Sequence, residues 1–183
     1  MDPSHSTLPV SALGVPGYAL VTGGASGIGR AIVRLLAREA CAGIAVADIN
    51  SDALAMVQKE LAAIATNKDF RCITVNVDVR DESSIADMVK RATESFGRID
   101  YAVNRAGVGL KKPLADTDLK EWDRMMGINV TGVFLCMEAE INQMITQEPT
   151  IAYGLDPPLF NVACRKHLLT QISGHTPRCS AGP

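Results

Sequence analysis

The sequence predicts an α/β fold built on a doubly wound parallel sheet, with helices on both of its faces. From Tyr18 onward, short apolar runs alternate with segments of helical periodicity, which is the pattern of βαβ units. The first apolar run leads into the glycine-rich stretch Thr22–Arg30, TGGASGIGR, and a helical pattern follows it. Because crossovers between parallel strands are right-handed, a doubly wound sheet is the economical topology.

Strands and helices alternate through residues 18–145. The expected strands are the apolar runs at 18–22, 44–48, 71–77 and 101–104. The run at 44–48, IAVAD, is apolar up to its final acid, as expected of a strand buried on both faces. The expected helices carry apolar residues at three- and four-residue steps, at 28–40, from a cap at Ser51 to Ile64, at 81–96, and from Asp118 or Glu121 to Ile145.

The chain divides into three parts. Residues 1–17 contain prolines and no charged leading region, so we predict a flexible arm and not a signal peptide. Residues 18–147 hold the regular pattern and form one domain. Prolines interrupt residues 148–183, which we expect to be an irregular tail. Within it, residues 159–164 (LFNVAC) read either as a fifth strand or as a chance apolar run, so we expect the sheet to be incomplete on its C-terminal side.

Composition excludes several classes of function. The formal net charge of −2 provides no basic surface for nucleic acid or for membrane lipids, and no apolar run is long enough to span a bilayer. The five cysteines are scattered and form no C-x-x-C pair, and the three histidines do not cluster with them. We therefore expect reduced thiols, no metal site and a cytoplasmic location.

The glycine-rich stretch is suited to binding phosphate. Glycines let the backbone approach a ligand closely, and the start of a helix offers free N–H groups and a positive dipole end. Gly24 and Gly29 have the spacing of the two glycines of a phosphoryl-transfer P-loop, but Arg30 and Ala31 follow where that motif needs Lys and then Ser or Thr. Alanine cannot supply the hydroxyl that binds magnesium, so the P-loop alternative is rejected.

An acid at the end of the second strand favours a dinucleotide instead. Asp48 lies roughly 20 residues beyond the turn, where dinucleotide-binding folds place the carboxylate that binds a ribose hydroxyl. A carboxylate there would repel a 2′-phosphate, so NAD is favoured over NADP. The alternative is that Asp48 only ends the strand.

Four motifs, in order, resemble those of the short-chain dehydrogenase/reductase family. The turn has the form Thr22-Gly23-x-x-x-Gly27-x-Gly29, and Asp78-Val79 follows the third strand. Asn104-Arg105-Ala106-Gly107 is similar to the family's Asn-Asn-Ala-Gly, and Ile128-Asn129-Val130-Thr131-Gly132 to its central helix. The stretch MEAEINQMITQEP (137–149) resembles fungal members that act in secondary metabolism.

The resemblance implies a Rossmann-like fold, hydride transfer between NAD or NADP and a small alcohol or carbonyl substrate, and homo-oligomers. It makes Asn129 a catalytic residue. The residues that it and the turn chemistry assign to cofactor binding are Thr22, Gly23, Ser26, Gly27, Ile28, Gly29, Asp48, Asn50, Asp78, Val79, Asn104, Ala106 and Gly107.

The family's catalytic Tyr-x-x-x-Lys pair has no counterpart in these 183 residues. Thr22, Arg105 and Pro157 stand four residues after the three tyrosines. If LFNVAC matches the family's fifth strand, Cys164 takes the position of the catalytic serine, and Pro177 and Ala181 take those of the tyrosine and lysine. An oxidoreductase, an inactive cofactor-binding remnant and a binding module therefore all stay open.

Truncation would also leave apolar surface uncovered. The fourth strand, or a short fifth one, would form the edge of the sheet, which favours aggregation. On the long helix we expect five apolar residues to be poorly covered and to favour self-association, namely Val133, Phe134, Met137, Ile141 and Met144.

Overall fold

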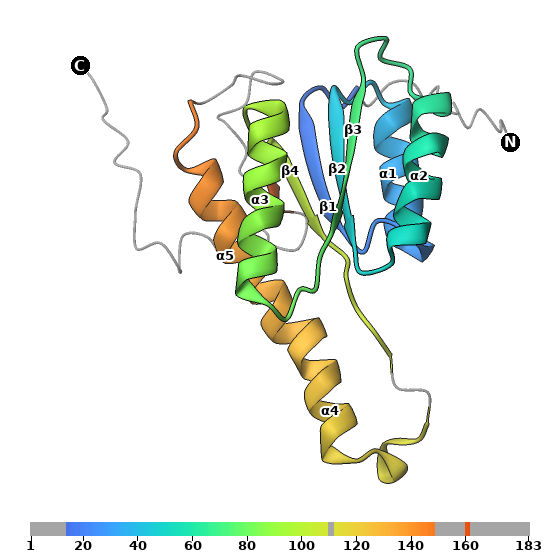
Figure 1. Ribbon diagram of the computed structural model, residues 1–183, viewed down its shortest axis with the longest axis vertical. Coiled ribbons are helices and arrows are strands. Elements are labelled where there is room, and N and C mark those ends of the chain that lie inside the picture. The colour runs from blue at the N-terminus through green and yellow to red at the C-terminus, as the bar shows by residue number, and fades with distance from the viewer. Residues whose placement is uncertain (1–13, 110–111, 149–159, 162–183) are drawn as a thin grey trace, which may run out of the picture.

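The computed structural model describes residues 14–109, 112–148 and 160–161, which form a parallel sheet between two layers of helices (Figure 1). The strands run β3-β2-β1-β4-β5 across the sheet. Their bounds are β1 Tyr18–Thr22, β2 Gly43–Asp48, β3 Arg71–Asn76, β4 Tyr101–Asn104 and β5 Phe160–Asn161. The predicted doubly wound α/β fold is confirmed.

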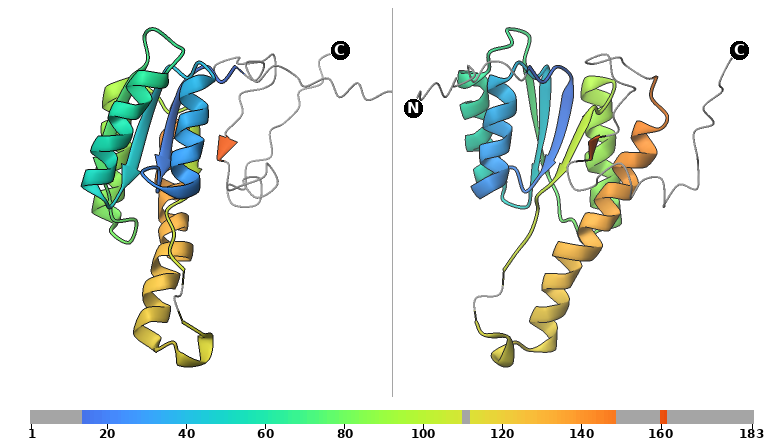
Figure 2. Two further views of the ribbon diagram at one scale, coloured as in Figure 1. Left: turned by 90° about the vertical axis from the view of Figure 1, so that its right-hand side faces the viewer. Right: turned by 180° about the vertical axis from the view of Figure 1, so that it is seen from behind.

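The helices lie where the periodicity places them, with shifts of one or two residues at their ends. Their bounds are α1 Gly27–Arg38, α2 Ser51–Ile64, α3 Glu82–Phe96, α4 Leu119–Met126 and α5 Val133–Met144, with a short 3₁₀ turn at Leu114–Asp116. Helices α1 and α2 cover one face of the sheet, and α3 and α5 cover the other (Figures 1 and 2).

Alternation along the central strand β1 separates the two cores. Ala19 and Val21 pack with α1 and α2 residues such as Val33 and Leu61, while Leu20 packs with the α3 and α5 residues on the opposite face. All three β1 side chains are almost fully buried. A parallel strand with both faces covered must be apolar throughout, which explains the unbroken apolar runs of β1 and β2.

Three helix starts and ends differ from the sequence prediction. Asn50, and not Ser51, caps α2, because its side-chain oxygen accepts a hydrogen bond from Ala53 N at 3.0 Å. Asp81 precedes α3 as its cap and accepts from Ser83 N. Helix α1 ends at Arg38 and not at Ala40, whose φ of 63° is left-handed and cannot continue a helix.

The long helix predicted up to Ile145 is continuous in space but has three parts. Asp118 begins it with a capping box, in which its carboxylate accepts from Glu121 N at 2.8 Å. Residues Gly127–Gly132 then form a π-helical segment between α4 and α5. Helix α4 projects away from the sheet, below it in Figure 1, while α5 packs beside α3. Such wide turns are frequent at functional sites.

The prediction that five apolar residues of the long helix are poorly covered is partly wrong. Met144 is only 6% exposed, because it joins the core between α3 and the sheet. Phe134 is 57% exposed, as expected, and Val133, Met137 and Ile141 are half-buried.

Two residues of the proposed fifth strand pair with the sheet. Phe160 aligns with Tyr101 and Asn161 with Ala102, so β5 partly covers the outer side of β4. Residues 162–164, with Cys164, lie outside the described residues, as do residues 1–13 of the predicted arm. The described part of the chain contains no helix both long and apolar enough to cross a bilayer, and no group of three or more side chains suited to a metal ion.

The turn between β1 and α1 depends on close backbone packing. A Cβ added at Gly29 would overlap the carbonyl oxygen of Gly23 and lie 2.8 Å from its carbonyl carbon. Both of these are backbone atoms, so neither can move aside without shifting the strand end. Gly27, in contrast, has open space around it and needs glycine only for its φ of 50°.

These two glycines give the first prediction. Gly29→Ala will lower the free energy of unfolding by about 2–3 kcal/mol, because a methyl group must displace packed backbone. Gly27→Ala, the matched control, will lower it by about 1 kcal/mol, the cost of a left-handed alanine. Urea unfolding followed by circular dichroism, without added ligand, measures both. Equal losses in the two variants would contradict the packing argument.

Candidate functional site

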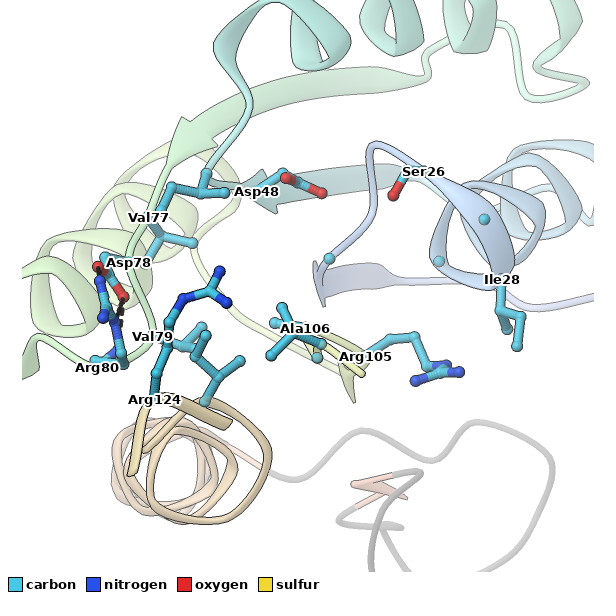
Figure 3. A pocket seen from close by; sticks show the side chains of 17 residues that line it. Ser26, Ile28, Asp48, Val77, Asp78, Val79, Arg80, Arg105, Ala106 and Arg124 are labelled. Carbon is cyan, nitrogen blue, oxygen red and sulfur yellow. Dashed lines mark hydrogen bonds and ion pairs between the residues drawn. The ribbon is translucent and has the colours of Figure 1, made fainter. Parts of the chain in front are cut away.

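A cavity of about 340 Å³ opens at the carboxyl ends of the parallel strands (Figure 3). In doubly wound sheets ligands bind at this edge, where the chain order reverses, which here is between β1 and β4. Ten of the thirteen residues predicted for cofactor binding line the cavity: Gly23, Ser26, Gly27, Ile28, Gly29, Asp48, Asp78, Val79, Ala106 and Gly107.

The glycine turn forms one wall through its backbone. A Cβ at Gly23 would lie 2.7 Å from both Arg105 O and Ala106 N, so the turn is packed directly on the segment that follows β4. Ser26 precedes α1 without a side-chain hydrogen bond to the helix, and the first turn of α1 contains no acid. The backbone N–H groups of that turn can therefore serve an anionic ligand.

Asp48 occupies the end of β2 and is held by two backbone amides. Its Oδ2 accepts from Ala25 N and its Oδ1 from Asn50 N, both at 3.1 Å. The carboxylate thus connects the glycine turn to the start of α2. It has this structural role in addition to lining the cavity. Asn50 does not line the cavity; its side chain caps α2.

Asp78 lies beside an arginine that the sequence analysis missed. Arg80 Nε and Nη2 donate to the Asp78 carboxylate at 2.5–3.2 Å, and Arg80 N donates to Oδ1 at 3.0 Å. The side-chain hydrogen bond from Arg80 is the main reason why the pKa of Asp78 is lowered from its usual value. The Asp78 carboxylate therefore stays ionised, and the positive charge of Arg80 largely balances its negative charge.

Thr22 and Asn104 lie behind the cavity and not on it. Thr22 Oγ1 accepts from Arg105 N at 3.1 Å and from Ala106 N at 3.3 Å, and donates to Asn104 Oδ1 at 3.3 Å. Asn104 Nδ2 in turn donates to Oε2 of the fully buried Glu140 at 2.6 Å. These side chains fix the segment after β4 that forms the cavity floor.

Asn129 belongs to a second, more open hollow on the other side of that segment. Residues 104–109 and Val133 line it together with Asn129. Asn129 Oδ1 accepts from Val108 N at 2.9 Å and its Nδ2 donates to Val108 O at 2.8 Å. The side chain therefore holds the 104–109 segment to the π-helical turn that carries it.

The described cysteines are poorly suited to act as nucleophiles. Cys41 and Cys136 are buried and Cys72 is half-buried. Burial raises the pKa of the Cys41 thiol to about 11 and those of Cys72 and Cys136 to about 12, so these thiols are protonated near neutral pH. Cys164, the other predicted catalytic residue, lies outside the described residues, so its position relative to Asn129 is not tested.

Sequence reasoning missed seven residues that line the cavity: Ile49, Val77, Arg80, Arg105, Val108, Arg124 and Ile128. Five of them are within two residues of a predicted position on the same strand end or loop, and Ile128 immediately precedes Asn129. Arg124 is different, because only the path of the long helix brings it to the cavity.

The chain is similar to a large group of known proteins. A family model described as short chain dehydrogenase matches residues 17–151. A short-chain dehydrogenase of Penicillium roqueforti is 39% identical over 138 residues, which are 74% of this chain and 50% of that protein. One of Neurospora crassa is 40% identical over 128 residues, 69% of this chain and 47% of that protein. The chain thus spans about half the length of the curated relatives it matches.

Solved structures show the same likeness. A short-chain type dehydrogenase/reductase from Mycobacterium marinum has a TM-score of 0.66 at 33% identity, with 72% of this chain and 51% of that chain covered. Carveol dehydrogenase from Mycobacterium avium, solved in complex with NAD, has a TM-score of 0.64 at 29% identity, with coverages of 71% and 50%. Together with the glycine turn packed against the segment after β4, these matches establish that the chain belongs to the short-chain dehydrogenase family.

Proposed function

We propose that this chain binds a nicotinamide adenine dinucleotide in the 340 Å³ cavity, as part of an oxidoreductase that acts on a small alcohol or carbonyl substrate. The observation that carries the proposal is the hydrogen bond between Asp48 and the glycine turn. Asp48 Oδ2 accepts from Ala25 N, so the carboxylate that we propose for the ribose lies beside the turn that we propose for the diphosphate.

The residues present fit such a cofactor. The cavity volume falls within the range usual for small-molecule sites. The bare backbone at Gly23 and the uncapped first turn of α1 suit the diphosphate, while Asp48 suits the adenosine ribose. When bound, the dinucleotide would supply or accept a hydride at its nicotinamide ring.

The predicted residues divide by task under this proposal. The ten that line the cavity would contact the cofactor. Thr22 and Asn104 would act indirectly, by fixing the segment after β4, and Asn50 by fixing the start of α2. Asn129 would hold the 104–109 segment between the cofactor and the substrate side through Val108.

Turnover needs a proton-transfer group besides the cofactor. The 183 residues contain no Tyr-x-x-x-Lys pair, and Cys164 at the expected serine position cannot replace the tyrosine. This observation keeps an inactive cofactor-binding remnant as the second candidate. The two candidates share the binding step and differ in whether a bound dinucleotide is oxidised or reduced.

NAD is the proposed form of the cofactor, because the Asp48 carboxylate at the cavity would repel a 2′-phosphate. The NAD complex of carveol dehydrogenase is consistent with this choice. A cytoplasmic location, in keeping with reduced cysteines, and a role in fungal secondary metabolism remain proposals.

Homo-oligomers are the proposed assembly. Val130 and Phe134, four residues apart on the long helix, are 52% and 57% exposed, and Ile145 at its end is 64% exposed. Large apolar side chains gathered on one helix are typical of interfaces between protein chains.

Binding gives the second prediction. NADH will bind saturably to the full chain with a dissociation constant between about 1 μM and 1 mM, the range usual for enzyme ligands. ADP-ribose will compete, because the cavity suits the adenosine and diphosphate, whereas nicotinamide alone will not. NADH fluorescence measures the titration. Absence of saturable binding would contradict both the oxidoreductase and the inactive remnant. Binding without turnover over a panel of alcohols and carbonyls would favour the remnant.

Asp48 gives the third prediction. Asp48→Asn will weaken NADH binding about tenfold or more, because a hydrogen bond to a charged acceptor is replaced by one to a neutral amide. NADPH binding will weaken less or improve, since a repulsive charge is removed. The ratio of the two dissociation constants is the readout, and thermal unfolding monitors the loss of the Ala25 and Asn50 contacts. An unchanged ratio would show that Asp48 only ends the strand.

The exposed helix face gives the fourth prediction. Phe134→Glu will shift the full chain toward the monomer, because a charge cannot be buried in an apolar interface without a large cost. Ala55→Glu, at an exposed position of α2, is the control for added charge and will leave the assembly unchanged. Sedimentation velocity at micromolar concentration measures both. A wild-type chain that is already monomeric would contradict the proposed assembly.

A further inference from the structure

Arg124 reaches the cavity from an element outside the sheet. It lies on α4, one helical turn before Ile128, and both residues line the cavity. Figure 3 shows its side chain rising from the helix, with the guanidinium between the Asp48 end of β2 and Ala106. The predicted cofactor-binding set contains no residue of α4.

The charges around the cavity leave this guanidinium without a partner in the described part of the chain. Three arginines and two carboxylates line the cavity. Arg80 and Asp78 form an ion pair, and Asp48 accepts its hydrogen bonds from backbone amides. No hydrogen bond or ion pair joins the Arg124 side chain to another described residue, so it is free to meet a ligand.

The surfaces near Arg124 are mostly apolar, with the Asp48 carboxylate at the end of β2 as the charged group on this side. Val77 and Val79 line this end of the cavity, with Ala106 on the far side of the guanidinium (Figure 3). Ile128, one helical turn after Arg124, also lines the cavity. Arg124 is exposed, and its guanidinium pairs with no described residue and faces aliphatic side chains across the cavity. Such a group suits a flat aromatic ring, because guanidinium is planar, weakly hydrated and stacks on π systems. Purine bases commonly stack on arginine in this way.

The diphosphate belongs to the other end of the cavity. Arg105 extends toward Ile28, in the first turn of α1, where the glycine turn exposes its backbone (Figure 3). Arg124 points instead to the side bounded by β2 and the residues after β3. A 2′-phosphate at that side would meet the Asp48 carboxylate, so charge pairing with a phosphate is the less favourable role for Arg124.

We propose that Arg124 is a cofactor-binding residue whose guanidinium stacks on the adenine ring of the dinucleotide. This inference rests on the proposed function, because it needs the adenosine to occupy the cavity. It adds a residue from α4 to a site otherwise built from the strand ends and the loops after them, the first turn of α1 and Ile128.

Substitutions at Arg124 give the fifth prediction. In the full chain, Arg124→Ala will weaken ADP-ribose and NADH binding about two- to fivefold, the range for a cation stacked on a ring at an exposed site. Arg124→Lys will recover little of this loss, because an ammonium group has no plane to stack. Lys120→Ala is the matched control: it removes one positive charge from an exposed position of the same helix, one turn away, and will leave both affinities unchanged.

Calorimetric titration with ADP-ribose, NADH and NADPH measures these affinities, and circular dichroism checks that each variant is folded. Equal affinities in wild type and Arg124→Ala would overturn the stacking role while leaving the proposed function intact. If Arg124→Lys restored the wild-type affinity, and Arg124→Ala weakened the binding of NADPH alone, the stacking role would be overturned in favour of a phosphate contact. Failure of the wild type to bind any of the three ligands would overturn the proposed function and this inference with it.

Discussion

The Thr22 hydroxyl joins the two halves of the sheet at the point where the cavity opens. β1 pairs with β2 on one side and with β4 on the other, and Thr22 aligns with Ala47 and Asn104 in the two ladders. Its Oγ1 then accepts from the backbone of Arg105 and Ala106, just beyond β4. A short hydroxyl at 1% exposure can do this without adding bulk. The segment after β4 is thereby held against the glycine turn, and the cavity walls follow from that contact.

The same contact explains why the glycine turn tolerates few other residues. Gly23 and the 105–106 backbone are so close that a single methyl group would overlap three backbone atoms. Behind them, Asn104 extends the network to Glu140, which α5 brings to the underside of β4. Hydrogen bonds between buried polar groups are costly to leave incomplete, so this chain of contacts resists rearrangement. Asp48 is held to the glycine turn separately, by the hydrogen bond that it accepts from Ala25 N.

Local sequence patterns predicted the fold and much of the cavity, because strand ends and tight turns are encoded by adjacent residues. The apolar runs located β1–β4, and the motif residues from Gly23 to Gly107 line the cavity as a group. Thr22, Asn50 and Asn104 were grouped with them, although they do not line the cavity and act through hydrogen bonds. The spacing of a motif cannot distinguish residues that line a cavity from residues that hold the lining residues in place. Glu140 and Arg124 were missed because their positions depend on how the long helix packs, which no short motif encodes. Met144 was judged uncovered for the same reason.

The π-helical segment connects both hollows to one element. Ile128 lines the 340 Å³ cavity, and Asn129, the next residue, binds Val108 on the opposite side of the same loop. Adjacent residues of a helix point in different directions, so one turn can serve two sides of a loop that passes beside it. A displacement of α4 would therefore move Arg124 and Ile128 at the cavity together with the 104–109 segment. The two hollows are linked through this segment, and both depend on the position of the long helix.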